Sequence, residues 1–464
     1  MDKFDFITIG SGPAGQRAAI QAAKLGKNVA VVEKNLAIGG ACLHVGTIPS
    51  KTLREAVLYL SGWRQRGFYG RSYRVKQRIT AEDLMQRLDI TIRHEIEVLQ
   101  HKLGRNGVTT LVGSAQFKDP HVLRVEHVDG SLQEYYGEHI LIACGTMPSH
   151  PPNISFNGTS IIDSDDIMLM KNLPRSMAIV GAGVIGVEYA SIFSALDIEV
   201  TLIDGRPLML DFLDREITDE FIHNLRDRGV NIRLGDKVES IEDLGNGRVR
   251  LHLASGKQVR SEMVLFAAGR EGATQQLKIE SAGLAIDKRG RLTVDEHYRT
   301  SVPHIYAAGD VIGFPSLAST SMEQGRHAAC HAFGAQLAPP QYGEVFPFGI
   351  YAVPEMSVIG KTEEEVVKQG IKHEIGIARF RETSRGQILG LREGLLKLIF
   401  AIDDRKLLGA HIVGEGATEL IHIGQAVLAH GGTLDYFVNT VFNYPTLAEA
   451  YKVAALDAWN NFPA

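Results

Sequence analysis

Two glycine-rich segments with the same spacing constrain the fold more than any other feature of the chain. In residues 4–33 an apolar run, a glycine turn and an alanine-rich helical run are followed by a second apolar run that ends at Glu33. The turn contains Gly10, Gly12 and Gly15. Glycines at this spacing permit a tight bend, close approach of backbone to a pyrophosphate, and close packing of helix on strand. The segment therefore predicts a βαβ unit whose helix N-terminus faces the phosphates of a dinucleotide.

The same pattern returns in residues 177–204, with Gly181, Gly183 and Gly186 in the turn and Asp204 at the end of the second apolar run. In both copies the acid follows the first glycine by 23 residues. A single glycine turn is also typical of helix caps and hinges, but such a turn has no reason to recur with the same spacing and terminal acid. We therefore predict an α/β fold with two Rossmann-like dinucleotide-binding domains.

Three further segments mark where the chain passes between domains. Residues 141–148 and 265–272 are each a short apolar run that leads into a glycine, Gly145 or Gly269, and these two glycines are predicted to lie at a cofactor. Asp310 follows another apolar run and small residues. A carboxylate there is placed to accept hydrogen bonds from a ribitol or ribose hydroxyl, although a helix N-cap is the commoner use of such an aspartate.

The length of 464 residues exceeds what one hydrophobic core usually supports, so several domains are expected. We predict a discontinuous nucleotide-binding domain, a second one inserted into it, and a separate α+β C-terminal domain. Their predicted bounds are 1–150 with 271–345, 151–270, and 346–464. The proline-rich residues 338–349 are predicted to be a linker.

Composition excludes several classes of partner. The formal net charge is −5, and no lysine or arginine run suggests binding to nucleic acid or to an anionic membrane surface. No apolar stretch reaches the length of about 18 residues that a membrane span needs. The first strand-like run begins at Phe4, which leaves no room for a signal peptide, and the three cysteines lack metal-ligand spacing. These features predict a cytoplasmic protein.

The segment IGGACLHVGTIPSK, residues 38–51, together with both glycine turns and YAAGD, resembles the flavoprotein disulfide reductases over essentially the whole chain. The resemblance implies that the first turn binds FAD and the second binds NAD(P). It also implies that Lys51 lies beside the flavin ring and pairs with Glu188, whereas alone it reads as an ordinary helix lysine. The residues that it assigns to FAD are Gly10, Gly12, Gly15, Glu33 and Asp310.

The chain departs from this family at both parts of the thiol machinery. The first redox cysteine is kept as Cys42, but Thr47 occupies the position of the second, and a hydroxyl cannot resolve a mixed disulfide. Near the C-terminus Tyr444 replaces the family's histidine, while Glu449 is kept. A tyrosine with an ordinary pKa of about 10 is a poor base. We therefore expect no disulfide chemistry and interpret Cys42 as a packed remnant.

Within the family this pattern resembles the soluble pyridine nucleotide transhydrogenases. That resemblance implies a Si-specific NAD(P)⁺ transhydrogenase, a homodimer or higher homo-oligomer, that moves hydride between NAD(H) and NADP(H). Because only one nicotinamide fingerprint is present, both coenzymes would use one site in turn, through flavin N5, with ping-pong kinetics. The alternatives are an NAD(P)H-dependent quinone or dye reductase, and a redox-sensing module without useful turnover.

Coenzyme choice is predicted to depend on the end of the second fingerprint. Asp204 is placed to bind the adenosine ribose hydroxyls of NAD and to repel a 2′-phosphate. Arg206 lies two residues on and offers a planar fork that can pair with that phosphate, so we predict that one pocket serves both coenzymes. Glu419 and His422 lie three residues apart, which is more typical of a surface or interface pair than of a metal site, and no metal is assigned.

Overall fold

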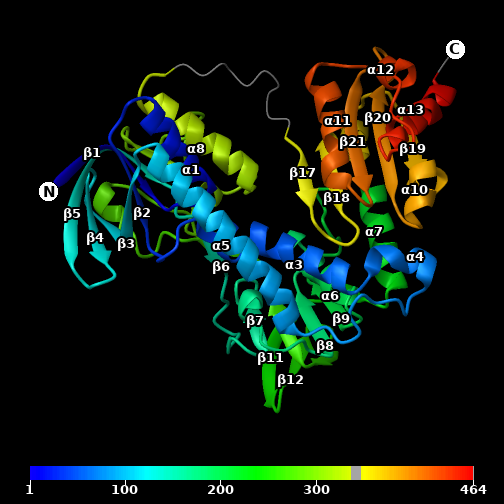
Figure 1. Cartoon of the computed structure of the whole chain (residues 1–464), viewed down its shortest axis with the longest axis horizontal. Helices are drawn as coiled ribbons and strands as arrows, with labels where there is room; N and C mark the ends of the chain where they lie inside the picture. Colours follow the sequence, from blue (N-terminus) through cyan, green and yellow to red (C-terminus); the bar gives the residue numbers. More distant parts are fainter. Residues whose placement is uncertain (336–345, 463–464) are drawn as a thin grey trace.

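A computed structural model describes residues 1–335 and 346–462, and it contains three regions that are each built around a β-sheet. The first lies near the N-terminus, the second lies below the centre in Figure 1, and the third carries the C-terminus. Within the described residues, no helix is both long and apolar enough to cross a membrane.

The first sheet has six strands in the order β1-β2-β3-β4-β5-β16, with β1 also paired to β5. Pairs that include β1 or β16 are parallel, whereas β4 is antiparallel to both of its neighbours. Its strands are β1 Asp2–Ile9, β2 Val29–Glu33, β3 Thr109–Asp119, β4 Val122–His127, β5 Leu132–Ile142 and β16 Ile305–Ala307. Helices α1, Pro13–Lys24, and α8, Ala318–Ala332, pack together beside this sheet. Alanines dominate the buried face of α1, and small side chains let the two helices approach closely.

The second sheet has five parallel strands in the order β10-β9-β8-β14-β7. They are β7 Ile161–Asp163, β8 Ser176–Val180, β9 Glu199–Asp204, β10 Asn231–Leu234 and β14 Met263–Phe266. Helices α6, Val184–Ser194, and α7, Arg215–Asp227, follow β8 and β9. A small antiparallel sheet is formed by β11 Val238–Gly245, β12 Arg248–Leu253 and β13 Gln258–Ser261. The central strands are buried almost throughout, as expected for a parallel sheet covered on both faces.

The two connections between these sheets run side by side. Strand β6, Thr146–Pro148, pairs with β15, Arg270–Gly272, in an antiparallel ribbon. Further backbone bonds extend it, because Ser149 N–H donates to the Gly269 carbonyl at 3.1 Å and Ala273 N–H donates to the Gly145 carbonyl at 3.0 Å. The segments expected at the domain exits therefore form one ribbon.

The C-terminal sheet has five antiparallel strands in the order β17-β18-β21-β20-β19. They are β17 Phe348–Ile350, β18 Met356–Gly360, β19 His373–Arg379, β20 Leu395–Ala401 and β21 Leu407–Val413. Its helices are α9 Glu363–Lys368, α10 Ser384–Leu389, α11 Ala417–Ala429, α12 Leu434–Asn439 and α13 Glu449–Asn461. The predicted linker, 338–349, lies mostly outside the described residues. Its end is a correction, because Phe348 and Gly349 pair with β18 and so belong to a strand.

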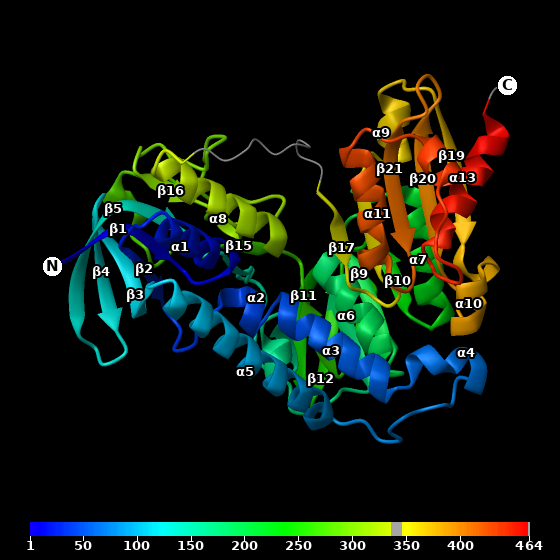
Figure 2. The same cartoon turned by 45° about the horizontal axis from the view of Figure 1, so that its top comes forward.

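The remaining elements connect the three regions. They are the helices α2 Gly40–His44, α3 Thr47–Leu60, α4 Arg66–Tyr69 and α5 Ala81–Arg105, and the short 3₁₀ turns η1 Trp63–Gln65, η2 Asp166–Leu169, η3 Ile279–Ala282, η4 Asp310–Ile312 and η5 Phe380–Glu382. Figure 2 shows α3 beside α6, on the way to α4. The buried Arg54 of α3 donates from Nε to the Ala352 carbonyl at 2.9 Å and pairs with Glu355 at 3.1 Å. Helix α3 is therefore fixed to the C-terminal region.

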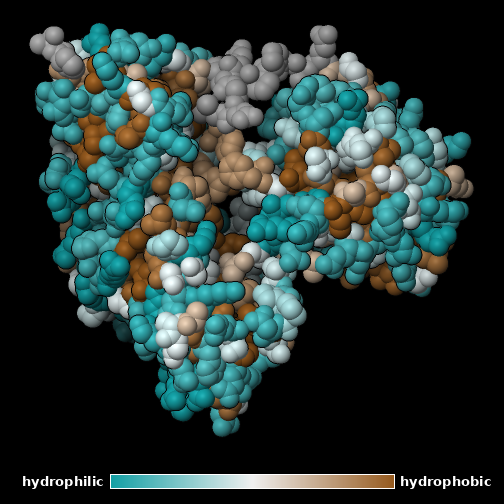
Figure 3. Space-filling model, turned by 180° about the vertical axis from the view of Figure 1, so that it is seen from behind, coloured by the Kyte–Doolittle hydropathy of each residue, from teal (hydrophilic) through white to brown (hydrophobic). Residues whose placement is uncertain are grey.

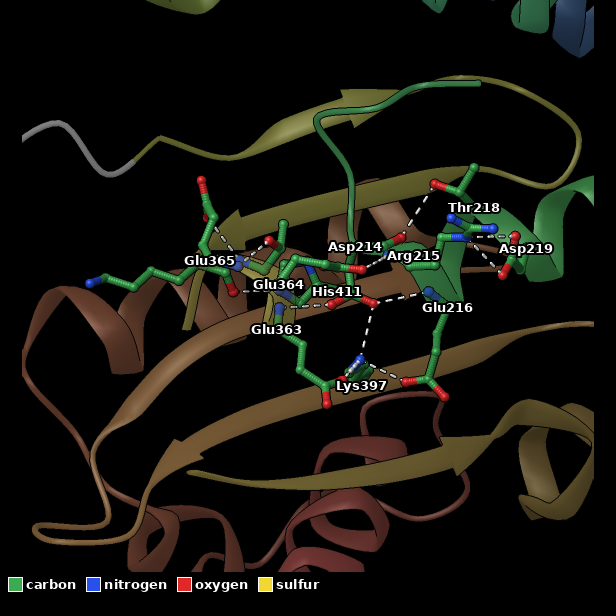
Figure 4. Close-up of polar contacts among 12 residues, drawn as sticks. Asp214, Arg215, Glu216, Thr218, Asp219, Glu363, Glu364, Glu365, Lys397 and His411 are labelled. Atoms are coloured by element: carbon green, nitrogen blue, oxygen red, sulfur yellow. Dashed lines mark hydrogen bonds and ion pairs between the residues drawn. The ribbon is translucent and has the colours of Figure 1, made fainter. Parts of the chain in front are cut away.

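A buried charge cluster joins α7 to the C-terminal sheet (Figure 4). The fully buried ammonium of Lys397, on β20, lies 3.1 Å from Asp214 and 2.7 Å from Glu216, and it also pairs with Glu363. Asp214 caps α7 and also accepts the first backbone N–H of α9, from Glu363, at 3.1 Å. Because a buried carboxylate is stable only when paired, this cluster locks the two regions together.

Candidate active site

A cavity of about 2240 Å³ lies where the three regions meet. It is lined by the first glycine turn, α2 and the start of α3, both interregional connections, the first residues of α6, and residues from β17 and α11. The face in Figure 3 is hollowed near its centre, with apolar side chains exposed beside the hollow. A cavity of this size and position has room for large ligands that contact several regions at once.

The first glycine turn has the geometry that a pyrophosphate cradle needs. Gly10 has a φ of +105°, and a Cβ added there would lie 2.4 Å from the Ala143 carbonyl oxygen. A Cβ on Gly15 would lie 1.9 Å from the Gly10 carbonyl oxygen, so both positions exclude any side chain. A Cβ on Gly12 would meet nothing within 4 Å, and Gly12 lines the cavity at the N-terminus of α1. The backbone is therefore open to an anion at Gly12 and tightly packed behind it.

Glu33, at the end of β2, has spare hydrogen-bonding capacity toward the cavity. Its buried carboxylate accepts the Ser11 hydroxyl at 2.6 Å, the Ser11 N–H at 3.1 Å and the Asn35 N–H at 3.0 Å. An ionised carboxylate accepts about four hydrogen bonds, so about one lone pair is left for a ribose hydroxyl. These residues fit the adenosine end of a dinucleotide.

Lys51 and Glu188 form an ion pair at the wall of the cavity. The Lys51 ammonium lies 2.7 and 2.9 Å from the two carboxylate oxygens of Glu188, which is nearly buried. The Tyr351 N–H donates to the same carboxylate at 2.8 Å, and the Lys51 ammonium lies 5.0 Å from the centre of the Tyr351 ring. Residues from all three regions therefore fix the position of the Lys51 ammonium. The sequence reasoning missed Tyr351, since no local motif marks it.

Cys42 lies on α2 with Thr47 beside it, and the described structure contains only free cysteines. Burial raises the pKa of the Cys42 thiol, and a hydrogen bond with Thr47 opposes the increase only in part. A thiol with a raised pKa is protonated at neutral pH and is a weak nucleophile. Tyr444 is 70% exposed and hydrogen-bonds to Ser384 Oγ. Neither Tyr444 nor Glu449 lines the cavity.

Asp310 lines the cavity as the first residue of η4. The N-cap position belongs to Gly309, so Asp310 does not take the N-cap use that its sequence context also suggested. Burial raises the pKa of Asp310, and the guanidinium of Arg270 is the strongest opposing influence. Gly145 lines the cavity with a φ of +66°, whereas Gly269, with a φ of +137°, is not part of its lining.

The second glycine turn repeats the geometry of the first. A Cβ on Gly181 would lie 2.6 Å from a backbone oxygen, and one on Gly186 would lie 1.8 Å from another. A Cβ on Gly183 would have only a guanidinium nitrogen of Arg206 within 4 Å, at 3.8 Å. The large cavity reaches Val184 but does not include the glycines of this turn.

Asp204 and Arg206 contact each other beside this turn. Asp204 accepts the Ala182 N–H at 2.6 Å, and the Arg206 guanidinium lies 2.9 Å from the same carboxylate. Burial raises the pKa of Asp204, but hydrogen bonds from Arg206 lower it by more. The net pKa is therefore below its ordinary value, and the carboxylate is ionised. The Arg206 side chain is 49% exposed and has a second acid, Asp211, at 3.7 Å. Arg206, the predicted partner of a 2′-phosphate, therefore already pairs with the carboxylates of Asp204 and Asp211.

His422 and Glu419 do not pair. His422 Nδ1 lies 2.7 Å from Gln425 Oε1 on the same helix. Within residues 1–335 and 346–462, no group of three or more His, Cys, Asp or Glu side chains is arranged to hold a metal ion.

Comparison with known families assigns most of the chain. Residues 4–325 match the pyridine nucleotide-disulphide oxidoreductase family, and residues 346–455 match the dimerisation domain of that family. The chain belongs to this family of oxidoreductases, and the predicted family and α/β fold class are confirmed.

More specific similarity is to one group of relatives. The chain is 51% identical over its full length to the soluble pyridine nucleotide transhydrogenase of Mycobacterium tuberculosis, covering 99% of that protein. It is 44% identical over 98% of each chain to the protein of that name from Escherichia coli. Among solved structures, the HOCl-induced flavoprotein disulfide reductase RclA from Escherichia coli matches with a TM-score of 0.88, at 28% identity and covering 97% of this chain and 99% of that one.

Proposed function

We propose that this protein is a FAD-dependent, Si-specific transhydrogenase that moves hydride between NAD(H) and NADP(H) with ping-pong kinetics and without a redox-active disulfide. One observation carries the proposal: the Lys51–Glu188 ion pair lines the same cavity as Cys42, a thiol whose pKa is raised by burial and whose family partner position is Thr47. The chain keeps the ion pair that would stabilise a reduced flavin, but it lacks the second cysteine and the histidine that disulfide exchange requires in this family. The names of the transhydrogenase relatives support the same activity.

Each of the three regions would have its own role. Residues 1–150 with 271–345 would bind FAD, residues 151–270 would bind NAD(P), and residues 346–464 would form a homodimer, consistent with the dimerisation-domain match. FAD would be held by Gly10, Gly12, Gly15, Glu33, Gly145 and Asp310, and the nicotinamide coenzyme by Gly181, Gly183, Gly186, Asp204, Arg206 and Gly269. A cytoplasmic location fits soluble coenzyme substrates.

FAD, when bound, supplies a ring that takes up and returns hydride at N5. The chain's own residues supply position and charge. Lys51 would place a positive charge beside the ring, where it would stabilise the negative charge of the reduced form. Glu188 fixes the Lys51 ammonium through both carboxylate oxygens, and the Tyr351 N–H fixes Glu188 in turn. This arrangement is preorganised, so little rearrangement is needed during the reaction.

One nicotinamide fingerprint implies that the two coenzymes alternate at one site. Asp204 would accept hydrogen bonds from the adenosine ribose of NAD(H). Arg206 would leave Asp204 and pair with the 2′-phosphate of NADP(H). Because Arg206 also lies beside Gly183, it is within reach of the coenzyme's phosphates in either case.

Stopped-flow spectroscopy tests the proposal. The purified flavoprotein should be bleached by NADPH and by NADH, and each reduced form should be reoxidised by the other oxidised coenzyme at a rate that accounts for steady-state turnover. Double-reciprocal plots of the initial rate against the concentration of one coenzyme, at several fixed concentrations of the other, should give parallel lines. Reoxidation by quinones or dyes but not by nicotinamide coenzymes would assign a quinone or dye reductase instead. Fewer than one turnover per flavin would assign a binding or sensing protein.

A further inference from the structure

We propose that Arg270 and Thr146 are positioning residues that would orient the Asp310 carboxylate toward the flavin's ribityl chain and favour its ionised form, and that Arg270 links this contact to the second sheet. The inference rests on the proposed FAD-binding role of Asp310. Neither residue was singled out by sequence, although each directly follows a glycine that was, Gly269 and Gly145 respectively.

A directional chain of hydrogen bonds runs from Arg270 to Asp310. Arg270 Nε donates to Thr146 Oγ1 at 3.0 Å, and Thr146 Oγ1 lies 3.4 Å from Asp310 Oδ2. A guanidinium can only donate, and a hydroxyl has a single hydrogen. Since Thr146 accepts from Arg270, its own hydrogen is free to point at the Asp310 carboxylate. The hydroxyl therefore stabilises the ionised form of Asp310.

The other nitrogens of Arg270 are also in use. Nη2 donates to the Thr146 carbonyl at 3.0 Å, and Nη1 donates to Asp165 at 2.8 Å and to Ser164 Oγ at 3.2 Å. Asp165 precedes η2 and follows β7 of the second sheet. Arg270 thus spans both interregional connections and the second sheet, and its side chain lines the cavity. A guanidinium whose three nitrogens all donate has one favoured orientation, which fixes the geometry of the chain that ends at Asp310.

The electrostatics follow from this arrangement. Burial raises the pKa of Asp310 above its ordinary value, and Arg270 on β15, the Thr146 hydroxyl and Arg291 offset part of that increase. The Cys42 thiol of α2 lines the same cavity and interacts electrostatically with Asp310, and its raised pKa leaves it neutral at neutral pH. An ionised carboxylate accepts hydroxyl hydrogen bonds more strongly than a protonated one. Affinity for FAD should therefore fall as the pH drops through the Asp310 pKa, and loss of Arg270 should move that fall to higher pH.

The test measures FAD release from the holoenzyme by flavin fluorescence as a function of pH. Arg270→Met removes the charge, and Thr146→Val removes the relay while keeping the charge and nearly the same volume. Arg289→Met, which changes an exposed arginine whose backbone carbonyl accepts the Gly272 N–H of β15, is the matched control. We expect the pH of half-release to rise by about one unit in Arg270→Met and by a smaller amount in Thr146→Val, and to stay unchanged in the control.

The Asp310→Asn background separates the inference from the site assignment. A carboxamide at this position cannot ionise, so adding Arg270→Met to Asp310→Asn should cause no further shift with pH. If Arg270→Met and Thr146→Val each weaken FAD by the same factor at every pH, both residues are structural only and the inference is overturned. If Asp310→Asn alone leaves FAD affinity unchanged, the assignment of Asp310 to the flavin fails, and the inference fails with it. If Arg270→Met does not fold, Thr146→Val decides the question.

Discussion

Replacing Arg206 with alanine should weaken the use of NADPH and spare the use of NADH. The guanidinium of Arg206 now contacts Asp204 at 2.9 Å and Asp211 at 3.7 Å, and its side chain is 49% exposed. At such exposure an ion pair contributes about 0 to 1 kcal/mol, so little is lost when Arg206 leaves its carboxylates. A charge-assisted hydrogen bond to a 2′-phosphate contributes about 1.5 to 3 kcal/mol.

The difference between these two free energies sets the expected decrease in kcat/KM for NADPH. Subtracting the lost ion pair from the gained phosphate contact leaves roughly 0.5 to 3 kcal/mol, which corresponds to a decrease of about 2- to 150-fold in kcat/KM for NADPH. For NADH there is no phosphate to bind, so kcat/KM should change less than about threefold. Asp204→Ala should act in the opposite direction, because it removes the ribose acceptor and the repulsion of the phosphate.

The assay is the initial rate of flavin reduction by each coenzyme in single-mixing stopped flow. Arg215→Ala, an exposed arginine at the start of α7 that pairs with Asp219, serves as the matched control. Equal losses for NADPH and NADH in Arg206→Ala would refute the assignment of Arg206 to the phosphate. A wild-type protein that NADPH does not reduce would refute the use of both coenzymes by this site.

The remaining predictions concern the flavin, the thiol and the buried charge cluster. The protein should purify yellow, with about one FAD per chain by absorbance, whereas a colourless preparation that cannot be reconstituted would contradict the flavin site. Cys42→Ser should leave transhydrogenation largely intact, and lipoamide and glutathione disulfide should not be turned over; loss of activity with flavin still bound would give the thiol a catalytic role. Lys397→Met should lower the free energy of unfolding by about 3 to 5 kcal/mol in urea titrations at saturating FAD, because it leaves Asp214 buried and unpaired, whereas the exposed Lys406→Met should have no measurable effect. Burial raises the pKa of Asp214, but the nearby His411 and Lys397 lower it by more, so its net pKa lies below the ordinary value. The stability that the charge cluster contributes should therefore be present above about pH 4 and be lost as the pH falls through the lowered pKa. An unfolding midpoint for Lys397→Met equal to that of the wild type would contradict this account.

The local parts of the fold were predictable because their signals are local. Each glycine turn, with its flanking runs and terminal acid, lies within about 30 residues, and the structure shows why Gly10, Gly15, Gly181 and Gly186 permit no side chain. The family match adds the pairing of distant residues, such as Lys51 with Glu188, which no spacing rule supplies.

The contacts between regions could not be predicted in the same way. Tyr351, Thr146 and Arg270 act through a backbone N–H, a hydroxyl and a guanidinium whose partners lie more than 100 residues away. No periodicity marks such contacts, because they depend on how whole regions pack. The linker prediction was wrong at its end for a related reason: Phe348 and Gly349 look like part of a proline-rich connection, but pairing with β18 makes them a strand.

The β6–β15 ribbon also bears on how such a protein can change over evolutionary time. Because the chain leaves the first sheet through Thr146–Pro148 and returns through Arg270–Gly272, the two ends of the intervening segment lie side by side and are hydrogen-bonded to each other. A segment with adjacent ends can be exchanged for another of different length or ligand preference without moving the host sheet. The ribbon is thus a natural graft point. A chimera that exchanges the segment between these two strands for that of a relative should be cut within the strands.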